Sequence, residues 1–180
     1  YVQVLARQLL ALAPSLTQLN DAIAQRFAAH PDAALFTAVP GAGHALAPRL
    51  LVAFGTDRTR FPTAADLQMR AGIALVTVRS GKQCRVHWRW ATSTFLRQTF
   101  QEFAQHSIAR CAWARAFYQH QRQRGKKHHA AVRSLAFKWI RILWRCWQDH
   151  VPYDDARYER ALAERGSPLA SQLHPTLAPT

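Results

Sequence analysis

The sequence predicts a mainly α-helical protein with one small β-hairpin. A helix-hairpin-helix-like element comes first, followed by the β-hairpin and two long basic helices. Apolar residues recur at steps of three and four along most of the 180 residues, which is helical spacing. Residues 73–78 are instead rich in β-branched side chains, and residues 84–90 alternate apolar with basic ones, as strands do. Because 49% of the residues are hydrophobic, a packed core can form and wholesale disorder is excluded.

The first 30 residues are predicted to form a connector or coiled-coil helix. A narrow apolar stripe follows them, and Pro14 marks a kink or a break between two helices. An ordinary helix facing a core fits this pattern equally well. Because the chain begins at Tyr1, already within the pattern, we expect a partner domain upstream. The stripe consists of Val2, Leu5, Leu9, Leu12, Leu16, Leu19, Ile23 and Phe27.

Residues 31–165 are predicted to form the main domain. Residues 166–180 are rich in proline, serine and alanine and are predicted to be a disordered tail. Proline, glycine and capping residues divide the helical segments of the main domain, and Thr63 is placed to cap the third of them. Helices are expected over 31–38, 45–54, 63–71, 94–123, 128–150 and 152–165.

A glycine-rich turn joins the first two helices of the main domain. Gly41 and Gly43 let the backbone approach a phosphate, whose charge would meet free N–H groups at the positive end of the next helix. Such contacts involve the DNA backbone and are independent of base sequence. The sequence therefore predicts DNA binding at both glycines. A plain helix–helix turn that needs glycine for its geometry is an equal alternative.

The two strands are expected to form a hairpin with its turn over residues 80–83, one apolar face and one cationic face. Ser80 lies at this turn, where neighbouring cations could position a phosphodiester and stabilise a transition state. A serine needs help from a base or a metal to act as a nucleophile. From spacing alone, a polar turn residue in a basic patch is the simpler interpretation. The cations concerned are Arg79, Lys82, Arg85 and Arg89.

The loop between the two long helices is a second cationic segment. It spans residues 121–129, and we expect Lys126 and Lys127 to bind phosphates, although a solvated loop has the same composition. In the helix that follows, Lys138, Arg141 and Arg145 are spaced to share one outward face.

The tryptophans fall into two groups. Trp139 and Trp147 are predicted to lie in the core, because of their helical spacing. Trp88 and Trp90 alternate with arginines in the hairpin, and either could stack on an unpaired base instead.

The net charge of +14 is unevenly distributed. Residues 79–147 contain 15 of the 24 lysines and arginines but a single acid, Glu102, so the rest of the chain is neutral. This asymmetry favours a polyanionic partner, either nucleic acid or an anionic membrane. No uninterrupted apolar stretch predicts a transmembrane helix, and the tryptophans are too scattered for a membrane-surface helix. DNA is therefore the predicted partner, and no membrane is expected.

The sequence offers little support for a metal site or a disulfide framework. Its three cysteines lie far apart and are odd in number, which fits a reducing cytoplasm. No histidine or cysteine pair has zinc-ligand spacing. Asp154 and Asp155 are better explained as a helix cap than as magnesium ligands. We therefore expect no metal and no cofactor in this chain.

An ordered series of motifs lies over roughly residues 35–165. It includes Val39-Pro40-Gly41-Ala42-Gly43, Arg60-Phe61-Pro62, Ala71-Gly72, Ser80-Gly81-Lys82, Gly125-Lys126 and Pro152-Tyr153-Asp154. The series resembles the C-terminal half of bacterial insertion-sequence transposases of the IS-one-ten type. Each motif is weak alone, but their order is specific. Where many members have a stretch rich in glycine and lysine after the serine, this chain has residues 88–95, although Leu96-Arg97 is retained.

The resemblance implies a two-domain recombinase. An N-terminal RuvC-like domain would hold Mg²⁺ with carboxylates, and residues 1–30 would connect it to this C-terminal domain. Ser80 would be the nucleophile that forms a phosphoserine link to DNA, with Arg97 among the DNA-binding residues. Family members use a guide non-coding RNA and act as dimers or tetramers, so a guide RNA and a homo-oligomer of the full-length protein are implied.

Two hypotheses follow from the sequence. The first is the DNA-binding C-terminal part of an insertion-sequence transposase, which carries out DNA transposition through a serine and is inactive without its metal-binding domain. The alternative is a non-catalytic nucleic-acid-binding module, or a decayed remnant of such an element.

Overall fold

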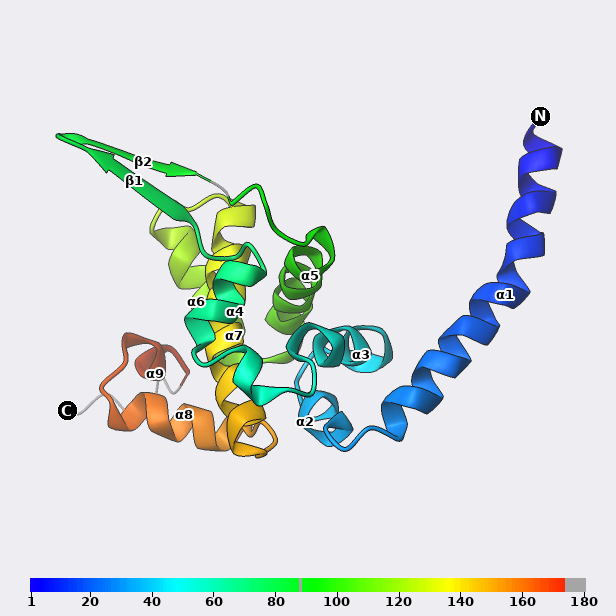
Figure 1. The fold of residues 1–180 in the computed structure, drawn as a ribbon. Coiled ribbons are helices and arrows are strands. Elements are labelled where there is room, and N and C mark those ends of the chain that lie inside the picture. Colours follow the sequence, from blue (N-terminus) through cyan, green and yellow to red (C-terminus); the bar gives the residue numbers. More distant parts are fainter. Residues whose placement is uncertain (88, 174–180) are drawn as a thin grey trace.

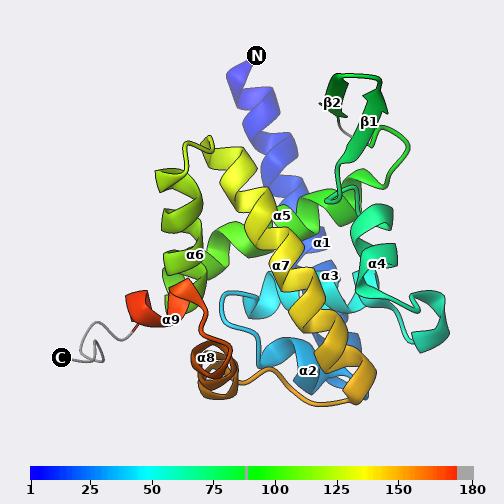
Figure 2. The same cartoon turned by 90° about the vertical axis from the view of Figure 1, so that its left-hand side faces the viewer.

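The computed structural model describes residues 1–87 and 89–173, and it confirms the mainly α-helical fold class with one small hairpin. Helices surround a central α7 and the hairpin projects from one end (Figures 1 and 2). The helices are α1 (Val2–Ala28), α2 (Ala33–Thr37), α3 (Gly43–Phe54), the 3-10 turn η1 (Arg58–Arg60), α4 (Ala64–Arg70), α5 (Thr94–Arg110), α6 (Ala112–Gln123), α7 (His128–Asp149), α8 (Asp155–Glu164) and α9 (Pro168–Leu173); the strands are β1 (Val76–Ser80) and β2 (Gln83–His87).

Helix α1 extends away from the rest of the molecule (Figure 1). It is one continuous helix with Pro14 inside it, rather than two helices. None of its residues is buried, and only Phe27 near its C-terminal end packs against the core. Apart from Phe27, its apolar stripe is therefore exposed and does not face the core of the described residues.

The core is built around α7, which packs against α4, α5 and α6. Trp113, Trp139 and Trp147 are fully buried, which confirms the prediction for the last two. Buried indole N–H groups need acceptors. Trp139 Nε1 donates to Ser107 Oγ over 2.8 Å, and Trp147 Nε1 donates to the Gly55 carbonyl over 3.1 Å.

The predicted long helix over 94–123 is wrong, because the chain forms two helices, α5 and α6, that meet at Cys111. The backbone of Cys111 is extended (φ −134°, ψ 124°). The Arg115 guanidinium donates to the carbonyls of Ile108 and Ala109, at 3.1 and 3.0 Å, and so satisfies groups at the end of α5. The change of direction allows Trp113 to enter the core, where its Nε1 lies 2.6 Å from the Tyr153 hydroxyl.

The predicted disorder from residue 166 is also wrong for the described part of that segment. Helix α9 contacts α6 and α8, and Leu169 is only 6% exposed. Burial of this leucine stabilises a short helix that the proline- and serine-rich composition did not suggest. Residues 174–180 lie outside the described residues.

A buried ion pair fixes η1 to its neighbours. Arg58 Nη2 lies 2.7 Å from Asp32 Oδ1, and the Asp32 side chain is 3% exposed. The same guanidinium lies 5.1 Å from the Trp147 ring centre and donates to the Trp147 carbonyl. Arg58 therefore joins α2, η1 and the C-terminal end of α7.

Candidate nucleic-acid interface

The hairpin presents Ser80 at its tip. Ser80 pairs with Gln83, so Gly81 and Lys82 form a two-residue loop. Gly81 has a φ of 58°, a conformation that favours glycine at the first position of such a loop. Every residue from Thr77 to His87 is exposed, and the hairpin projects from the helices (Figure 1). The serine hydroxyl is therefore accessible to a large partner.

The register corrects the predicted division of the hairpin into an apolar face and a cationic face. Arg79 pairs with Cys84, whereas Arg85 pairs with Val78. Opposed residues of an antiparallel pair share a face, so each face has one of these arginines. Ser80 shares its face with Arg85, and Arg79 lies on the other face. The two-residue loop sets this register, and because neither face is buried, no core requires the strands to segregate apolar residues.

The segment after β2 returns the chain to α5. Arg89 is half-buried, and its Nε has no hydrogen-bond partner in the described part of the protein. Arg97 is half-buried in α5. Trp90 is 83% exposed, in contrast to the three fully buried tryptophans. Trp88 lies outside the described residues, so its predicted stacking role stays a prediction.

The α6–α7 turn concentrates positive charge at the start of a long helix. Lys126 and Lys127 are exposed, and the first turn of α7 has no acidic residue. Partial burial and the nearby Arg124 and Arg133 lower the pKa of Lys126. The N-terminal end of a helix carries a partial positive charge, so these cations are repelled by the end of α7 and by one another. A bound anion would offset this repulsion. The turn and the hairpin lie at the same end of the molecule (Figures 1 and 2).

The glycine turn has a structural explanation at one of its two glycines. A side chain on Gly41, at φ 85°, would place its Cβ 3.0 Å from the Ser107 backbone nitrogen in α5. The alternative of a turn that needs glycine for geometry therefore accounts for Gly41. At Gly43 nothing lies within 4 Å of such a Cβ. DNA contacts at both glycines stay predictions.

Gly43 opens onto a hollow of about 510 Å³ at the start of α3. No side chain caps this end of the helix. Arg49, His106 and Arg110 line the hollow together with Glu102, which forms an ion pair with Arg49. Uncapped N–H groups beside Arg110, which forms no ion pair with a described residue, are surroundings that suit a phosphate. The hollow is therefore the part of this turn most suited to an anion.

Gly41→Ala should lower the free energy of unfolding by about 2–4 kcal/mol, because a left-handed backbone and a contact with the α5 backbone both oppose a methyl group. Gly43→Ala, at φ 55° in open space, is the matched control and should cost about 1 kcal/mol. Urea unfolding of the two variants gives this difference. Equal losses would contradict the close packing of Gly41 on α5.

The two acidic residues predicted to cap a helix, Asp154 and Asp155, both accept hydrogen bonds in the structure. Asp154 accepts hydrogen bonds from the Ala156 and Arg157 backbone N–H groups, at 2.9 and 3.2 Å, which confirms its capping role. Asp155 accepts one from the Tyr153 hydroxyl over 2.6 Å. In the described residues no three histidine, cysteine or acidic side chains gather as a metal site. No described helix combines the length and apolarity needed to cross a membrane.

Lys138 departs from its predicted place on an outward basic face. It is half-buried, and its Nζ lies 4.8 Å from the Phe117 ring centre and 5.5 Å from that of Trp113. Burial, with a smaller contribution from Arg141, lowers the pKa of Lys138. The aromatic rings that cover Lys138 belong to α6, so the residue spacing along α7 could not indicate its burial. Of the predicted trio, Arg141 and Arg145 are exposed, and Arg145 pairs with Asp149.

The glycine turn, the hairpin with Ser80 and the start of α6 fall within one region of similarity to known proteins. Residues 33–119 match the model of the transposase IS116/IS110/IS902 family. The matched region ends before the α6–α7 turn, so Lys126 and Lys127 lie beyond it.

Three relatives extend the similarity. The chain is 31% identical over 153 residues to a protein of Streptomyces coelicolor named as a candidate transposase of the IS117 mini-circle, covering 85% of this chain and 37% of that protein. Over 84% of its length, the chain is 32% identical to the uncharacterized 42 kDa protein of insertion element IS900 from Mycobacterium paratuberculosis. Over 85% of its length, it is 35% identical to the uncharacterized 43.6 kDa protein of insertion element IS110 from S. coelicolor. The chain spans 38% of the length of each of these last two. The chain is thus similar to part of the proteins of insertion elements.

Proposed function

We propose that this chain is the DNA-binding, serine-bearing C-terminal part of an insertion-sequence transposase. The observation that supports it most is the family match over residues 33–119, which includes Ser80 at the exposed tip of a hairpin with cations on both faces. The cationic α6–α7 turn at the same end adds a surface for the sugar–phosphate backbone. Gly41, Gly43, Arg89 and Arg97 complete the proposed DNA-binding residues.

In this proposal Ser80 Oγ attacks a phosphorus atom of DNA. A bond forms between Oγ and phosphorus, the bond from phosphorus to the leaving sugar oxygen breaks, and the hydroxyl proton ends on that leaving oxygen. Arg85 shares the Ser80 face of the hairpin and Lys82 lies in the adjoining loop, so these two would stabilise the phosphate charge. Arg79, on the other face, would contact a neighbouring phosphate.

The proposed chemistry needs help in removing the serine proton. Gln83, Val78 and Arg85, the described residues next to Ser80 on its face, offer no base. His87 shares that face but pairs with Val76 at the far end of the hairpin, away from Ser80. The described residues do not fit a Mg²⁺ site, so no step is assigned to a metal held by this chain. By resemblance, an N-terminal domain would supply Mg²⁺ and a guide RNA would select the DNA. A homo-oligomer of the full-length protein belongs to the same proposal.

Ser80→Ala in the full-length protein should reduce strand transfer to background, because no other atom can form the covalent link. Binding to a DNA duplex should stay within about twofold, since the cations remain. Thr77→Ala is the matched control, because it removes a hydroxyl from the same strand on the opposite face of the hairpin. The comparison needs one recombination assay and one binding titration.

If Ser80→Ala recombines DNA as well as Thr77→Ala does, the serine assignment is wrong. If neither the parent protein nor the control recombines DNA, yet both bind it, the alternative of a non-catalytic binding module replaces the enzyme.

A further inference from the structure

Arg60 and Arg70 lie in the part of the sequence whose formal charges cancel, yet their local charges are not neutralised. Asp57 and Asp66 are the acids nearest to them in the sequence. Asp57 Oδ1 instead accepts hydrogen bonds from Thr59 N and Oγ1, at 2.9 and 2.6 Å. These bonds from Thr59 are the largest cause of the lowered Asp57 pKa, to which the charge of Arg60 contributes least.

Asp66 is occupied in the same way. Its Oδ2 accepts hydrogen bonds from Thr63 N and Oγ1, at 2.9 and 2.7 Å, within the capping box that starts α4. Arg60 and Arg70 are both exposed, and neither forms an ion pair with any described residue. Both acids are therefore occupied by hydrogen bonds at the starts of η1 and α4, and the two guanidinium groups are left to bind an anion.

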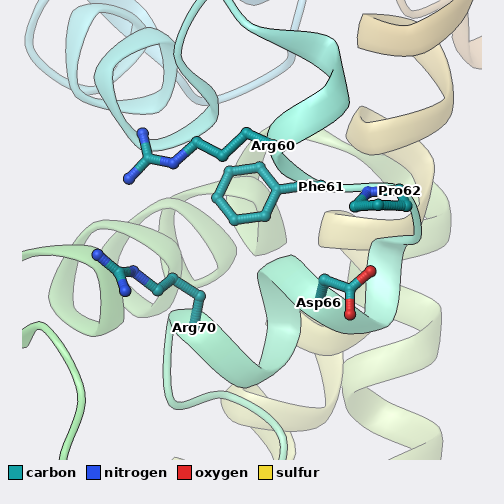
Figure 3. A pocket seen from close by; sticks show the side chains of 5 residues that line it. All are labelled: Arg60, Phe61, Pro62, Asp66 and Arg70. Carbon is teal, nitrogen blue, oxygen red and sulfur yellow. The ribbon is translucent and has the colours of Figure 1, made fainter.

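The two arginines border one hollow (Figure 3). It measures about 410 Å³ and is lined by Arg60, Phe61, Pro62, Asp66 and Arg70. Both guanidinium groups extend toward the same side, past the Phe61 ring, whereas the Asp66 carboxylate points away from them (Figure 3). Arg60 Cζ lies 5.2 Å from the centre of that ring. An anion on this side of the hollow would meet two cations and an apolar wall.

The elements that bear these arginines are fixed to α7. The Phe61 carbonyl accepts from Trp144 Nε1 over 2.9 Å, and the Arg58 carbonyl accepts from Gln148 Nε2 over 3.0 Å. On α4, the buried Gln68 donates from Nε2 to the Phe137 carbonyl over 2.8 Å. Both arginines thus extend from backbone held by the same helix, which limits the backbone entropy lost when they bind a ligand.

We propose that Arg60 and Arg70 clamp a backbone phosphate of nucleic acid, at a site additional to the hairpin and the α6–α7 turn. A guanidinium donates two parallel hydrogen bonds to a phosphate, and two guanidinium groups can bind one phosphate from two sides. The inference rests on the proposed function for the kind of ligand, because the chain must meet nucleic acid for the clamp to bind it. It extends the positive surface beyond residues 79–147.

The double variant R60Q/R70Q tests the clamp in the full chain. The probes are a short DNA duplex, one of its strands, and an RNA of the same sequence, each titrated over a range of salt concentrations. We expect the slope of log affinity against log salt to fall by about one if both arginines bind one phosphate, and by about two if each binds its own. The probe whose slope falls identifies DNA or RNA as the source of the phosphate.

Two further variants make the result specific. R7Q/R26Q removes the same charge from α1 and should leave the slope unchanged. R60K/R70K keeps the charge but loses the planar fork, so its slope should stay while its affinity falls several-fold. Thermal unfolding of R60Q/R70Q should match that of the parent, because both side chains are exposed.

The clamp is overturned if R60Q/R70Q shows the slope and affinity of R7Q/R26Q for all three probes. A failure of the proposed function is a different result, in which the unaltered chain itself binds none of the probes. Loss of binding by R60Q/R70Q at unchanged thermal stability, with R7Q/R26Q unaffected, supports the clamp.

Discussion

Trp139→Ala should lower the free energy of unfolding by about 3–5 kcal/mol, the usual range for removing a buried tryptophan. Trp139 is fully buried at the centre of an aromatic cluster. Its ring centre lies 4.6 Å from that of Trp113 and 5.1 Å from those of Phe103 and Tyr153. The variant also leaves Ser107 Oγ without the indole donor. A cavity forms where α5, α6 and α7 meet, so the effect should be the largest of any single substitution considered.

Urea unfolding measures this loss, and two further variants interpret it. Trp139→Phe keeps part of the apolar contact but not the hydrogen bond, so it should cost about 1–3 kcal/mol. Trp90→Ala removes an exposed ring and should change stability by less than about 0.5 kcal/mol. Similar costs for Trp139→Ala and Trp90→Ala would contradict the packing around α7.

Replacing Arg124, Lys126 and Lys127 together by glutamine should weaken duplex DNA binding by roughly 100-fold at low salt and lower the salt slope by up to about three. These residues surround the positive end of α7, where no acid of its first turn offsets them. Because backbone contacts carry no base information, the loss should be the same for unrelated DNA sequences.

The matched control replaces Arg157, Arg160 and Arg165, three cations at and just after α8, by glutamine. It produces the same change in net charge in a segment that also has acidic residues. We expect a loss of less than about threefold, since only screened long-range attraction changes. Equal losses in the two triple variants would mean that net charge, rather than the α6–α7 turn, determines DNA binding.

Local signals predicted much of the fold. Thr63 was predicted to cap its helix, and in the structure it does so as part of a capping box with Asp66. The hairpin could be predicted from alternation around Ser80-Gly81-Lys82, because a two-residue turn with glycine is a local property. Helix α7 could be predicted from its regular apolar spacing alone.

Features that depend on distant partners could not be predicted. No glycine or proline marks the break at Cys111; the burial of Trp113 beside Tyr153 explains it. Lys138 has the spacing of a solvated residue but lies against aromatic rings of another helix. Leu169 gives α9 its stability only because α6 and α8 are there to cover it. Tertiary contacts outweigh local composition at each of these positions.

The candidate site, like the fold, could be predicted only where local sequence determines it. Ser80 and the cations near it were evident as a cluster in the sequence, but the side of the hairpin on which each arginine lies depends on register. Arg79 and Arg85 fall on opposite faces for this reason. Arg60 and Arg70 were hidden because their charges cancel in a count, whereas in the structure Asp57 and Asp66 are bound to threonines. A sum of charges over a segment does not show which of them are available.

The most direct test of the proposed function is to identify the residue joined to DNA. Full-length protein would be incubated with a nicked DNA substrate that traps a covalent intermediate, then digested and analysed by mass spectrometry. The proposal requires the DNA remnant on the peptide that contains Ser80, as a phosphoserine ester, and its absence in Ser80→Ala. A remnant on another residue, or recombination without any covalent link, would contradict it.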